Sequence, residues 1–372
     1  GTILITSKNK IKGLTTAAGL WAAACTGLAI GAGFYTLGII ASISIVVILT
    51  ILPAIEQFFR RKSRGLIADG ERIRFTMTEQ NKLILKTYCE KIEEQLLEFT
   101  KHKESLQGII YEAMEYSLMA GGKRLRPVLM LEFCRMCGGD VSKYLDIACT
   151  IEMIHTFSLI HDDLPCMDDD DYRRGRPSCH KAFPESIALL AGDTLNTLAF
   201  ETIAKAAIEG RISADKAVML ISVLGNAVGA EGMIGGQVID LESEGKDISL
   251  ETLNILQEKK TGALIEAACV MGVILGGKFD KIPAAASYAG ALGKAFQIVD
   301  DILDVTGSFE ELGKPIGSDS EQNKSTYVSL IGLEESKYTA DRLTEEALNY
   351  LDEFEDNEFL QDLTKNLLER RS

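Results

Sequence analysis

The chain has 372 residues, a formal net charge of −15 and 46% apolar residues. At roughly 100–200 residues per domain, this length predicts two domains, or one large domain with an appendage. The apolar content is enough to build a core and excludes intrinsic disorder. The acidic balance excludes broad nucleic-acid binding, which needs a cationic surface. The charge is unevenly spread, because residues 1–76 hold nine Lys/Arg and three Asp/Glu, which leaves 30 basic and 51 acidic residues in 77–372.

The first part of the chain contains an uncharged stretch of 43 residues between Lys12 and Glu56. One helix that crosses a bilayer needs about 20 residues, so the stretch is long enough for two, which we place near 14–31 and 36–54. Four basic residues follow the second span, namely Arg60, Arg61, Lys62 and Arg64. By the positive-inside rule, we expect this end to face the cytoplasm.

The same part of the chain resembles a known family. The segments that resemble the last membrane portion of MgtC-type bacterial membrane proteins are Gly13–Ala18, Trp21 and Gly27–Gly33. The resemblance implies that residues 1–60 are a fragment of such a protein, joined to the rest by genuine fusion or by a gene-model error. We therefore expect a membrane hairpin at 1–60, a basic linker at 61–76 and a main domain at 77–372, with Met77 as a natural start.

From residue 78 onward, the apolar residues recur at helical spacing among Glu and Lys, as at Leu85, Ile92 and Leu96. Long stretches of Ala, Leu, Glu and Lys continue through 143–161, 185–209, 213–243, 250–276 and 283–304. No run of alternating β-branched residues competes with this pattern. The sequence therefore predicts an all-α bundle for the main domain.

The strongest signal for chemistry is acidic, with six carboxylates in the ten positions that begin at Asp162. Asp162 and Asp168 are six residues apart and would not align on an ideal helix. Pro165 should end or distort the helix and bring Asp168 back towards Asp162. A second cluster, Asp300-Asp301-Ile-Leu-Asp304, falls inside an apolar helical stretch.

Asp300 and Asp304 are four residues apart and share one helix face. Like charges at this spacing destabilise a helix unless cations lie between them. Hard carboxylate oxygens suit Mg²⁺, which commonly bridges protein carboxylates to substrate phosphates. A single acidic run is more often a solvated face, but two clusters that each follow an apolar helical stretch favour a metal site.

The next signal is cationic and lies close to the acidic ones. Lys123, Arg124 and Arg126 precede a predicted helix start, and Arg173 and Arg174 directly follow the first acidic cluster. Arginine offers bidentate contacts to phosphate groups, and the spacing of a Walker loop is absent. Together these features predict a cavity with two metal-binding carboxylate walls and surrounding cations, which fits a substrate that leaves as pyrophosphate.

Three further groups carry weaker signals. His155 lies seven residues before Asp162 on nearly the same helix face, and a structural role and a place in the cavity are equally open. Lys260-Thr261-Gly262 and Gly313-Lys314-Pro-Ile-Gly317 are individually better explained as a helix cap or loop. The eight cysteines form no small disulfide framework, which favours a reducing compartment.

Seven motifs occur in a fixed order, namely GGKRLRP, HDDLPCMDDDDYRRGRPSCHK, GDTL, GGQVIDL, KTGAL, FQIVDDILD and GKPIGSD. As a set they resemble the trans-isoprenyl diphosphate synthases, specifically bacterial farnesyl diphosphate synthases, over 78–372. The resemblance implies an isoprenoid-synthase helical bundle around a central cavity, a homodimer and a cytoplasmic enzyme. It also implies Mg²⁺-dependent ionisation of an allylic diphosphate, with Mn²⁺ as a substitute metal. The double bond of isopentenyl diphosphate attacks, and a proton is lost to the released pyrophosphate.

The resemblance assigns roles residue by residue. Metal binding and catalysis fall to Asp162, Asp163, Asp168, Asp300 and Asp304, with Asp301 in the second catalytic motif. The isopentenyl diphosphate site falls to Lys123, Arg126, His155 and Arg174. The allylic diphosphate contacts fall to Arg173, Lys260, Thr261, Gln297 and Lys314, of which Arg173 and Lys260 are also counted as catalytic.

Product length should depend on the residues that precede Asp162, because chain growth stops where the tail meets a bulky wall. Phe157 lies five positions upstream and Ser158 four. Core packing alone would explain Phe157, but an aromatic residue there, together with the Pro165-Cys166 insertion, resembles the farnesyl-length pattern. We therefore expect a fifteen-carbon product, with geranylgeranyl diphosphate as the alternative.

Three other functions compete with this reading. A class I terpene cyclase shares the fold and the metal chemistry but needs no isopentenyl diphosphate site. A non-catalytic partner subunit predicts a damaged aspartate motif, which the sequence does not have. A membrane protein fragment with a non-catalytic domain would place the function in residues 1–76, where two spans are too few. We expect membrane tethering through residues 14–54 only if the extension belongs to the protein.

Overall fold

The computed structural model describes residues 5–7, 10–12, 77–306 and 325–368. The chain divides into two units, residues 1–74 and 75–372, which are described separately. In the first unit, β1 (Ile5–Ser7) and β2 (Lys10–Lys12) form an antiparallel hairpin. The two membrane spans and the basic linker lie outside the described residues, so these stay predictions.

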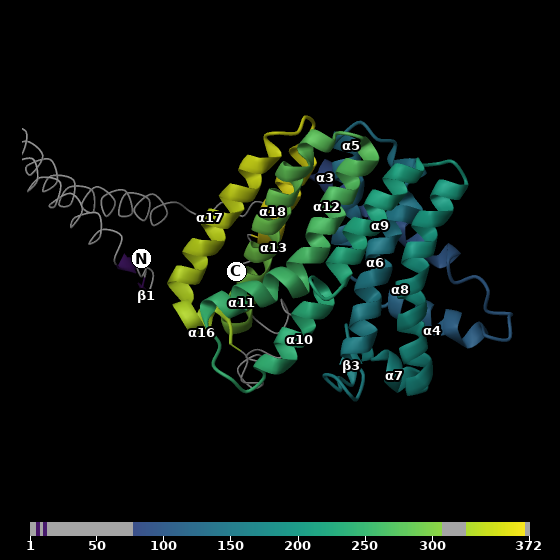
Figure 1. The fold of residues 1–372 in the computed structure, drawn as a ribbon, viewed down its shortest axis with the longest axis horizontal. Coiled ribbons are helices and arrows are strands. Elements are labelled where there is room, and N and C mark those ends of the chain that lie inside the picture. The colour runs from purple at the N-terminus through teal and green to yellow at the C-terminus, as the bar shows by residue number, and fades with distance from the viewer. Residues whose placement is uncertain (1–4, 8–9, 13–76, 307–324, 369–372) are drawn as a thin grey trace, which may run out of the picture. The chain divides into compact units, whose positions relative to one another are not determined.

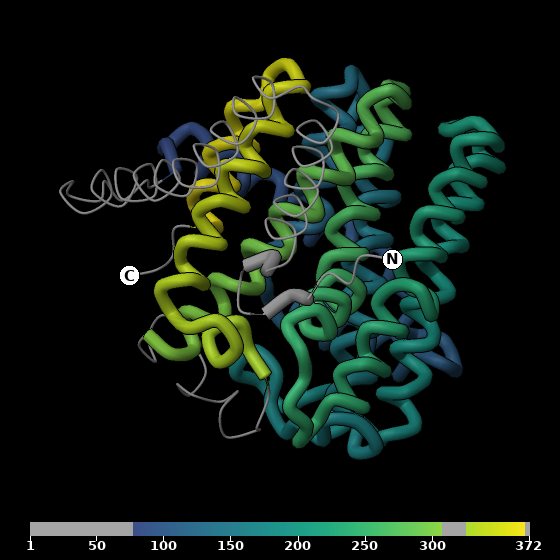
Figure 2. Tube along the Cα trace, turned by 60° about the vertical axis from the view of Figure 1, so that its left-hand side comes forward, coloured from purple at the N-terminus to yellow at the C-terminus, as the bar shows by residue number. Residues whose placement is uncertain are grey.

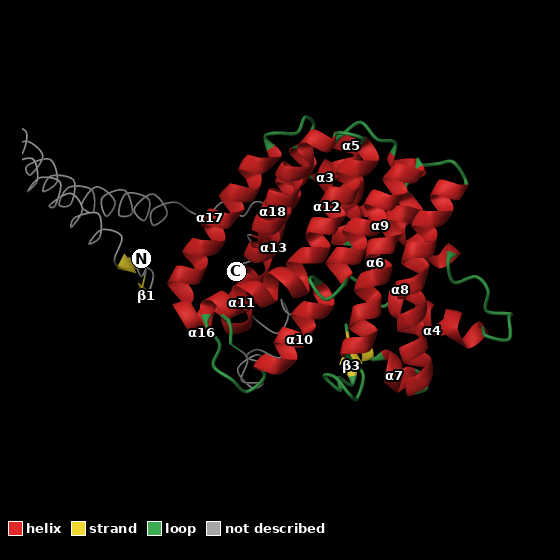
Figure 3. Cartoon of the chain, in the orientation of Figure 1, coloured by secondary structure: helices red, strands yellow, loops and turns green. Residues whose placement is uncertain are grey.

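The second unit is an all-α bundle, as the sequence predicts, and Figure 3 shows helices over nearly all of its described part. In chain order its helices are α3 (Glu79–Glu98), α4 (Gly108–Leu118), α5 (Leu125–Met136), α6 (Leu145–Asp162), α7 (Cys179–Ala182), α8 (Glu185–Ile208), α9 (Ala214–Val228), α10 (Met233–Ser243), α11 (Leu250–Gln257), α12 (Ala263–Gly276), α13 (Ile282–Thr306), α16 (Tyr327–Ile331), α17 (Leu333–Leu351) and α18 (Glu358–Leu368). Short helical turns are η1 (Val141–Lys143), η2 (Glu258–Gly262) and η3 (Phe279–Lys281). A short hairpin of β3 (Tyr172–Arg173) and β4 (Arg176–Pro177) is a feature that the helical periodicity does not predict.

Helix α12 forms the centre of the core, and its residues from Ala267 to Leu275 are all buried. It packs against α5, α9 and α13, and Figure 1 shows it within the bundle near these helices. The close approach to α5 depends on Gly272, because a Cβ there would lie 2.3 Å from the carbonyl oxygen of Met130. Figure 2 shows the yellow C-terminal helices beside green α13, consistent with the packing of α17 on α13.

Two predicted helical stretches are interrupted. The stretch 213–243 divides into α9 and α10, and Gly229 and Gly232 lie in the break. The stretch 250–276 contains η2, a π-helical turn between α11 and α12. Among the described residues, Ala214–Ser243 is long and apolar enough to cross a membrane by length and composition alone. Core helices meet the same criterion, and α9 packs against α8 and α12 here.

The start of the bundle is fixed by a cap and by a distant helix. The hydroxyl of Thr78 accepts a hydrogen bond from the Asn81 backbone at 3.2 Å, as a Thr at the N-cap of α3 should. The Asp362 carboxylate of α18 accepts from the Thr78 backbone N–H at 2.9 Å and from the Asn81 amide at 2.8 Å. The first helix is therefore tied to the last described one.

Candidate active site

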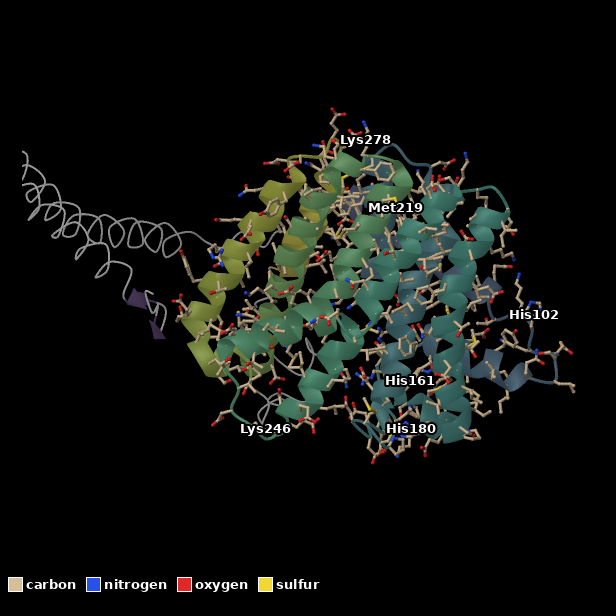
Figure 4. All side chains as sticks on the ribbon, in the orientation of Figure 1. His102, His161, His180, Met219, Lys246 and Lys278 are labelled. Carbon is tan, nitrogen blue, oxygen red and sulfur yellow. The ribbon has the colours of Figure 1, made fainter. Side chains whose placement is uncertain are left out.

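The first aspartate motif begins where α6 ends, at Asp162. The backbone N–H of Asp168 donates to the carbonyl oxygen of Asp162 at 2.9 Å, and Asp169 adopts φ 49° to complete the turn. The chain therefore folds back as Pro165 predicts, and the two aspartates are brought together. Figure 4 places His161, which precedes Asp162, and His180 near the end of the bundle that carries β3 and α7.

Asp163 is held by a cation of the same motif. Its side chain is buried, and its Oδ1 accepts from Arg173 Nε at 2.9 Å and from Arg173 Nη2. Burial raises the pKa of Asp163, while Arg173 opposes that shift. The predicted metal ligand Asp163 and the predicted diphosphate contact Arg173 thus bind each other in this structure.

Arg174 follows in the two-residue turn between β3 and β4. Arg174 and Gly175 have φ values of 53° and 74°, so both central residues are left-handed, as in the hairpin turns that match strand twist. The Arg174 guanidinium donates to the carbonyl oxygen of Gly121. The turn therefore connects the first aspartate motif to the cationic loop that precedes α5.

The second aspartate motif lies within α13, where Asp300 and Asp304 are one helical turn apart. Asp301, between them, forms hydrogen bonds within the protein: its Oδ2 accepts from the Tyr327 backbone N–H at 2.7 Å and its Oδ1 from the Gln297 amide at 3.2 Å. Asp301 and Asp304 are each 3% exposed. Asp301 therefore joins α13 to the start of α16.

Lys260 connects the two motifs. Its ammonium lies 2.6 Å from Asp240 Oδ2 of α10, and it sits in η2, a π-helical turn of a kind frequent at functional sites. Burial raises the pKa of Asp162 to about 6, and the positive charge of Lys260 is the strongest effect opposing that rise. Lys260 is thus an electrostatic neighbour of Asp162 as well as an ion-pair partner of Asp240.

A cavity of about 180 Å³ lies between α10, α11, η2 and α13. The predicted site residues that line it are Lys260, Thr261, Gln297 and Asp301. Asp240 lines it too and is a site residue that we did not predict, although the GGQVIDL motif contains it. Gly236 of the same motif lets the chain approach, because a Cβ there would lie 2.3 Å from the Lys260 backbone nitrogen.

Two of the predicted isopentenyl diphosphate residues, Arg126 and Arg174, form a cationic group around His155. Burial, followed by the charges of Arg126 and Arg174, holds the pKa of His155 well below its ordinary value, so the ring is neutral at pH 7. The Nε atom of Arg126 is buried and has no hydrogen-bond partner within the described part of the chain. The Lys123 ammonium lies 5.4 Å from the ring centroid of Phe296, which brings the cationic loop to α13.

The predicted chain-length residues lie on α6. Phe157 is 7% exposed, and its ring meets that of His161 edge to face, with centroids 5.1 Å apart. The ring of His161 is held in turn by the Leu189 carbonyl oxygen at 3.0 Å. The Ser158 hydroxyl donates to the His155 carbonyl oxygen at 2.9 Å. Phe157 thus packs on His161, which contacts α8 through Leu189.

The donor set fits a hard divalent metal in chemistry, although no group of three or more His, Cys, Asp or Glu in the described ranges is arranged to hold one. Asp162 and Asp168 converge on one side, and Asp300 and Asp304 offer carboxylates one turn apart. The buried amide of Gln237, one turn before Asp240, has no hydrogen-bond partner in the described chain, as expected beside a site that a further group would complete. Lys314 lies outside the described residues.

Comparisons with known families place both parts of the chain. Residues 107–367 match the family described as polyprenyl synthetase, and residues 1–58 match the MgtC family. The large subunit 1 of a heterodimeric geranylgeranyl pyrophosphate synthase from Arabidopsis thaliana is 49% identical over 246 residues, which cover 65% of this chain and 66% of that protein. A dimethylallyltranstransferase from Fischerella ambigua is 50% identical over 249 residues, which cover 66% of this chain and 71% of that protein.

Solved structures give the same result. An FPP/GFPP synthase from Zymomonas mobilis superposes with a TM-score of 0.69 at 35% identity, covering 78% of this chain and 99% of that one. A geranyltransferase from Legionella pneumophila has a TM-score of 0.70 at 33% identity, covering 79% and 98% of the two chains. Both similarities extend over nearly the whole neighbouring structure. The chain belongs to the polyprenyl synthetase family.

Proposed function

We propose that the main domain is a Mg²⁺-dependent prenyltransferase that condenses isopentenyl diphosphate with dimethylallyl or geranyl diphosphate to give farnesyl diphosphate and pyrophosphate. The observation that carries the proposal is the cavity that Lys260 lines together with Thr261, Gln297 and Asp301. The charge of Lys260, which opposes the rise in the pKa of Asp162, supports the link to the first motif. The position of Lys260 thus supports one shared site for both aspartate motifs. The cationic group around His155 supplies a second anion site beside it.

Different residues would bind the allylic diphosphate and isopentenyl diphosphate. Asp162, Asp168, Asp300 and Asp304 would hold Mg²⁺, which neutralises the leaving diphosphate when it is bound. Lys260 contributes a fixed positive charge next to these carboxylates, and Asp240 orients its ammonium. Arg126 and Arg174 would bind the diphosphate of isopentenyl diphosphate, and neutral His155 can donate a hydrogen bond to it without adding charge.

A terpene cyclase would not need the second anion site. The chain should therefore form product from geranyl diphosphate only when isopentenyl diphosphate is also present. Incubation of the full-length protein with labelled geranyl diphosphate, with and without isopentenyl diphosphate, tests this by chromatography of the products. Product formation that does not depend on isopentenyl diphosphate would favour cyclisation and contradict the proposal.

The fifteen-carbon product is the finer part of the proposal. It is supported by the buried, edge-to-face packing of Phe157 five residues before Asp162. Geranylgeranyl diphosphate is the alternative product, favoured by the names of the plant relatives, one of which is the Arabidopsis protein above. Phe157→Ala should shift the product towards twenty carbons, and Phe157→Tyr should keep it at fifteen. An unchanged chain-length profile in Phe157→Ala would remove Phe157 from this role.

We further propose that the enzyme acts as a homodimer. Two adjacent leucines of α8, Leu189 and Leu190, are 44% and 45% exposed, and we assign this apolar pair to the dimer interface. Light scattering after gel filtration should give twice the chain mass. Leu189→Glu with Leu190→Glu should give the monomer, and a monomeric wild-type protein would contradict the proposal.

The chain boundaries and the location of the enzyme are also proposals. We propose that catalysis resides in 77–372, in the cytoplasm, and that residues 14–54 add membrane contact where they are present. The full chain should sediment with membranes while 77–372 stays in the supernatant with full activity. If 77–372 alone is inactive, the extension is needed for catalysis and the proposal is contradicted.

A further inference from the structure

The buried guanidinium of Arg124 is part of the cationic loop but has no role in the function proposed above. Arg124 precedes α5 with a left-handed φ of 48°, and its side chain is 0% exposed. Its Nη1 donates to Glu152 Oε1 at 2.8 Å, and its Nη2 to the Leu118 carbonyl oxygen at 2.7 Å. Its Nε donates to Glu93 Oε1 at 3.1 Å. Arg124 therefore anchors the loop to three parts of the bundle.

Glu152 is the buried acceptor in this arrangement. It lies on α6 and is 2% exposed, and it precedes His155 by three residues, so both side chains share a helix face. Burial lowers the pKa values of Arg126 and Arg174, and in each case the charge of Glu152 is the strongest effect that opposes this lowering. One carboxylate thus serves Arg124 directly and both proposed diphosphate-binding arginines at longer range.

The other side of the loop is fixed by Arg174. Its guanidinium donates to the Gly121 carbonyl oxygen. It also packs on Gly122, where a Cβ would lie 2.7 Å from Arg174 Nη1, and Gly122 has a φ of 127° that an L side chain rarely adopts. The segment from Gly121 to Arg124 is therefore held from one side by Arg174 and from the other by Glu152.

We propose that Glu152 is a positioning residue for the diphosphate of isopentenyl diphosphate. By binding Arg124, it fixes the backbone from which Lys123 and Arg126 extend, and it keeps the arginines in place against their mutual repulsion. The inference rests on the proposed function, because it assigns the residue to one of the two substrate sites described there.

Glu152→Gln separates this role from a simple effect of charge. The variant removes a negative charge beside the anion site, so charge alone predicts tighter binding of a diphosphate. Loss of the charged acceptor releases Arg124 and loosens the loop, so positioning predicts weaker binding. The two explanations give effects of opposite sign.

The experiment measures KM for isopentenyl diphosphate, KM for geranyl diphosphate and kcat in the full-length protein. We expect Glu152→Gln to raise KM for isopentenyl diphosphate by about 10- to 100-fold, the cost of a misplaced binding group. KM for geranyl diphosphate should change less than about twofold, since that substrate binds at the other site. Calorimetry with inorganic pyrophosphate and excess EDTA should show weaker binding to the variant, because the cationic site needs no metal.

The matched control is Glu132→Gln, at another buried glutamate. Glu132 is 1% exposed, pairs with Arg135 at 2.9 Å and accepts from the Tyr88 hydroxyl at 2.5 Å. It should lose thermal stability comparably but keep both KM values. Arg124→Lys retains the charge without the guanidinium fork and should reproduce the selective rise in KM, so it replaces Glu152→Gln if that variant does not fold.

An unchanged or lower KM for isopentenyl diphosphate in folded Glu152→Gln would overturn the inference, as would an equal rise in both KM values. If the wild-type protein forms no product when isopentenyl diphosphate is added, the proposed function is overturned instead. In that case the calorimetric titration with pyrophosphate still tests the role of Glu152. If Glu152→Gln binds pyrophosphate as tightly as the wild type does, or more tightly, the positioning role is rejected.

Discussion

The carboxylates of the first aspartate motif follow the end of α6, whereas those of the second lie inside α13. In the first, a backbone hydrogen bond from Asp168 to Asp162 brings together residues that are six apart. In the second, the helix alone sets Asp300 and Asp304 one turn apart. A backbone turn after a helix can thus bring together two aspartates that helical spacing alone would place on different faces.

The two motifs also share a division of tasks. Each contains a buried aspartate that binds the protein itself, namely Asp163 with Arg173 and Asp301 with the Tyr327 backbone. We assign Asp162, Asp168, Asp300 and Asp304 to the metal, whereas Asp169, Asp170 and Asp171 pair with Lys181 or Arg173. The comparison teaches that consecutive aspartates in one motif need not have the same role, and each half of this statement can be tested.

The largest expected effect is on catalysis. Asp162→Asn and Asp304→Asn should each lower kcat by about 100- to 1,000-fold, as the loss of an electrostatic contact to a developing charge does. Steady-state kinetics at saturating Mg²⁺ measures this. Asp171→Asn is the control, because that side chain is 66% exposed and pairs with Lys181. A large loss in only one of the two variants would show that the motifs are not equivalent.

The next effect is on stability at the first motif. Arg173→Met leaves the buried Asp163 carboxylate without its guanidinium, and we expect the free energy of unfolding to fall by about 2 kcal/mol, the cost of a buried acceptor that loses its donor. Urea denaturation measures the change. Arg342→Met removes an ion pair whose side chains are 55% and 42% exposed and should cost less than about 0.5 kcal/mol. Equal losses in the two variants would mean that Asp163 does not depend on Arg173.

At the second motif, Asp301→Ala removes the acceptor of the buried Tyr327 N–H. The free energy of unfolding should fall by about 1–2 kcal/mol, the cost of an unsatisfied buried donor. Asp301→Asn keeps an acceptor oxygen and should recover most of that loss in the same denaturation experiment. If Asp301→Ala lowers kcat as Asp304→Asn does but leaves stability unchanged, Asp301 belongs with the metal-binding carboxylates.

The smallest expected effect is on the pH dependence of stability, and it concerns the helix of the first motif. His155 on α6 has a pKa well below its ordinary value because it is buried among arginines. Below about pH 6.5, His155 binds a proton in the unfolded chain but stays neutral in the folded protein. The free energy of unfolding therefore falls as the pH decreases. His155→Gln should therefore lose less stability than the wild type between pH 7.5 and pH 5.5. An identical pH dependence would show that folding does not lower the pKa of His155.

Most of the site geometry that could be predicted from the sequence is local. Pro165 was enough to predict the return of Asp168 towards Asp162, and spacing was enough to place Asp300 and Asp304 on one face. The all-α fold followed from the periodicity of the apolar residues. The roles of these residues in metal and substrate binding stay predictions.

The features that could not be predicted are contacts between distant segments. Glu152 lies in a helix that is buried on most sides, and only the folded chain shows that Arg124, 28 residues earlier, is its partner. Asp240 and Lys260 are similarly separated, and no propensity in Lys259-Lys260-Thr261 indicates a π-helical turn. The β3–β4 hairpin is too short for a strand pattern, although Arg174-Gly175 suits its turn.

The π-helical turn η2 has a consequence for how the chain can change in length. Deleting one residue from Lys259-Lys260-Thr261 would restore a regular α-helix, which should be locally more favourable. A π-helical turn takes about one residue more than an α-helical turn, so the deletion would leave α11 and α12 in nearly the same orientation. It would instead remove the bulge in which the ammonium of Lys260 pairs with Asp240. This segment should therefore accept substitutions that keep its length far better than it accepts deletions, even though a deletion would make a better helix.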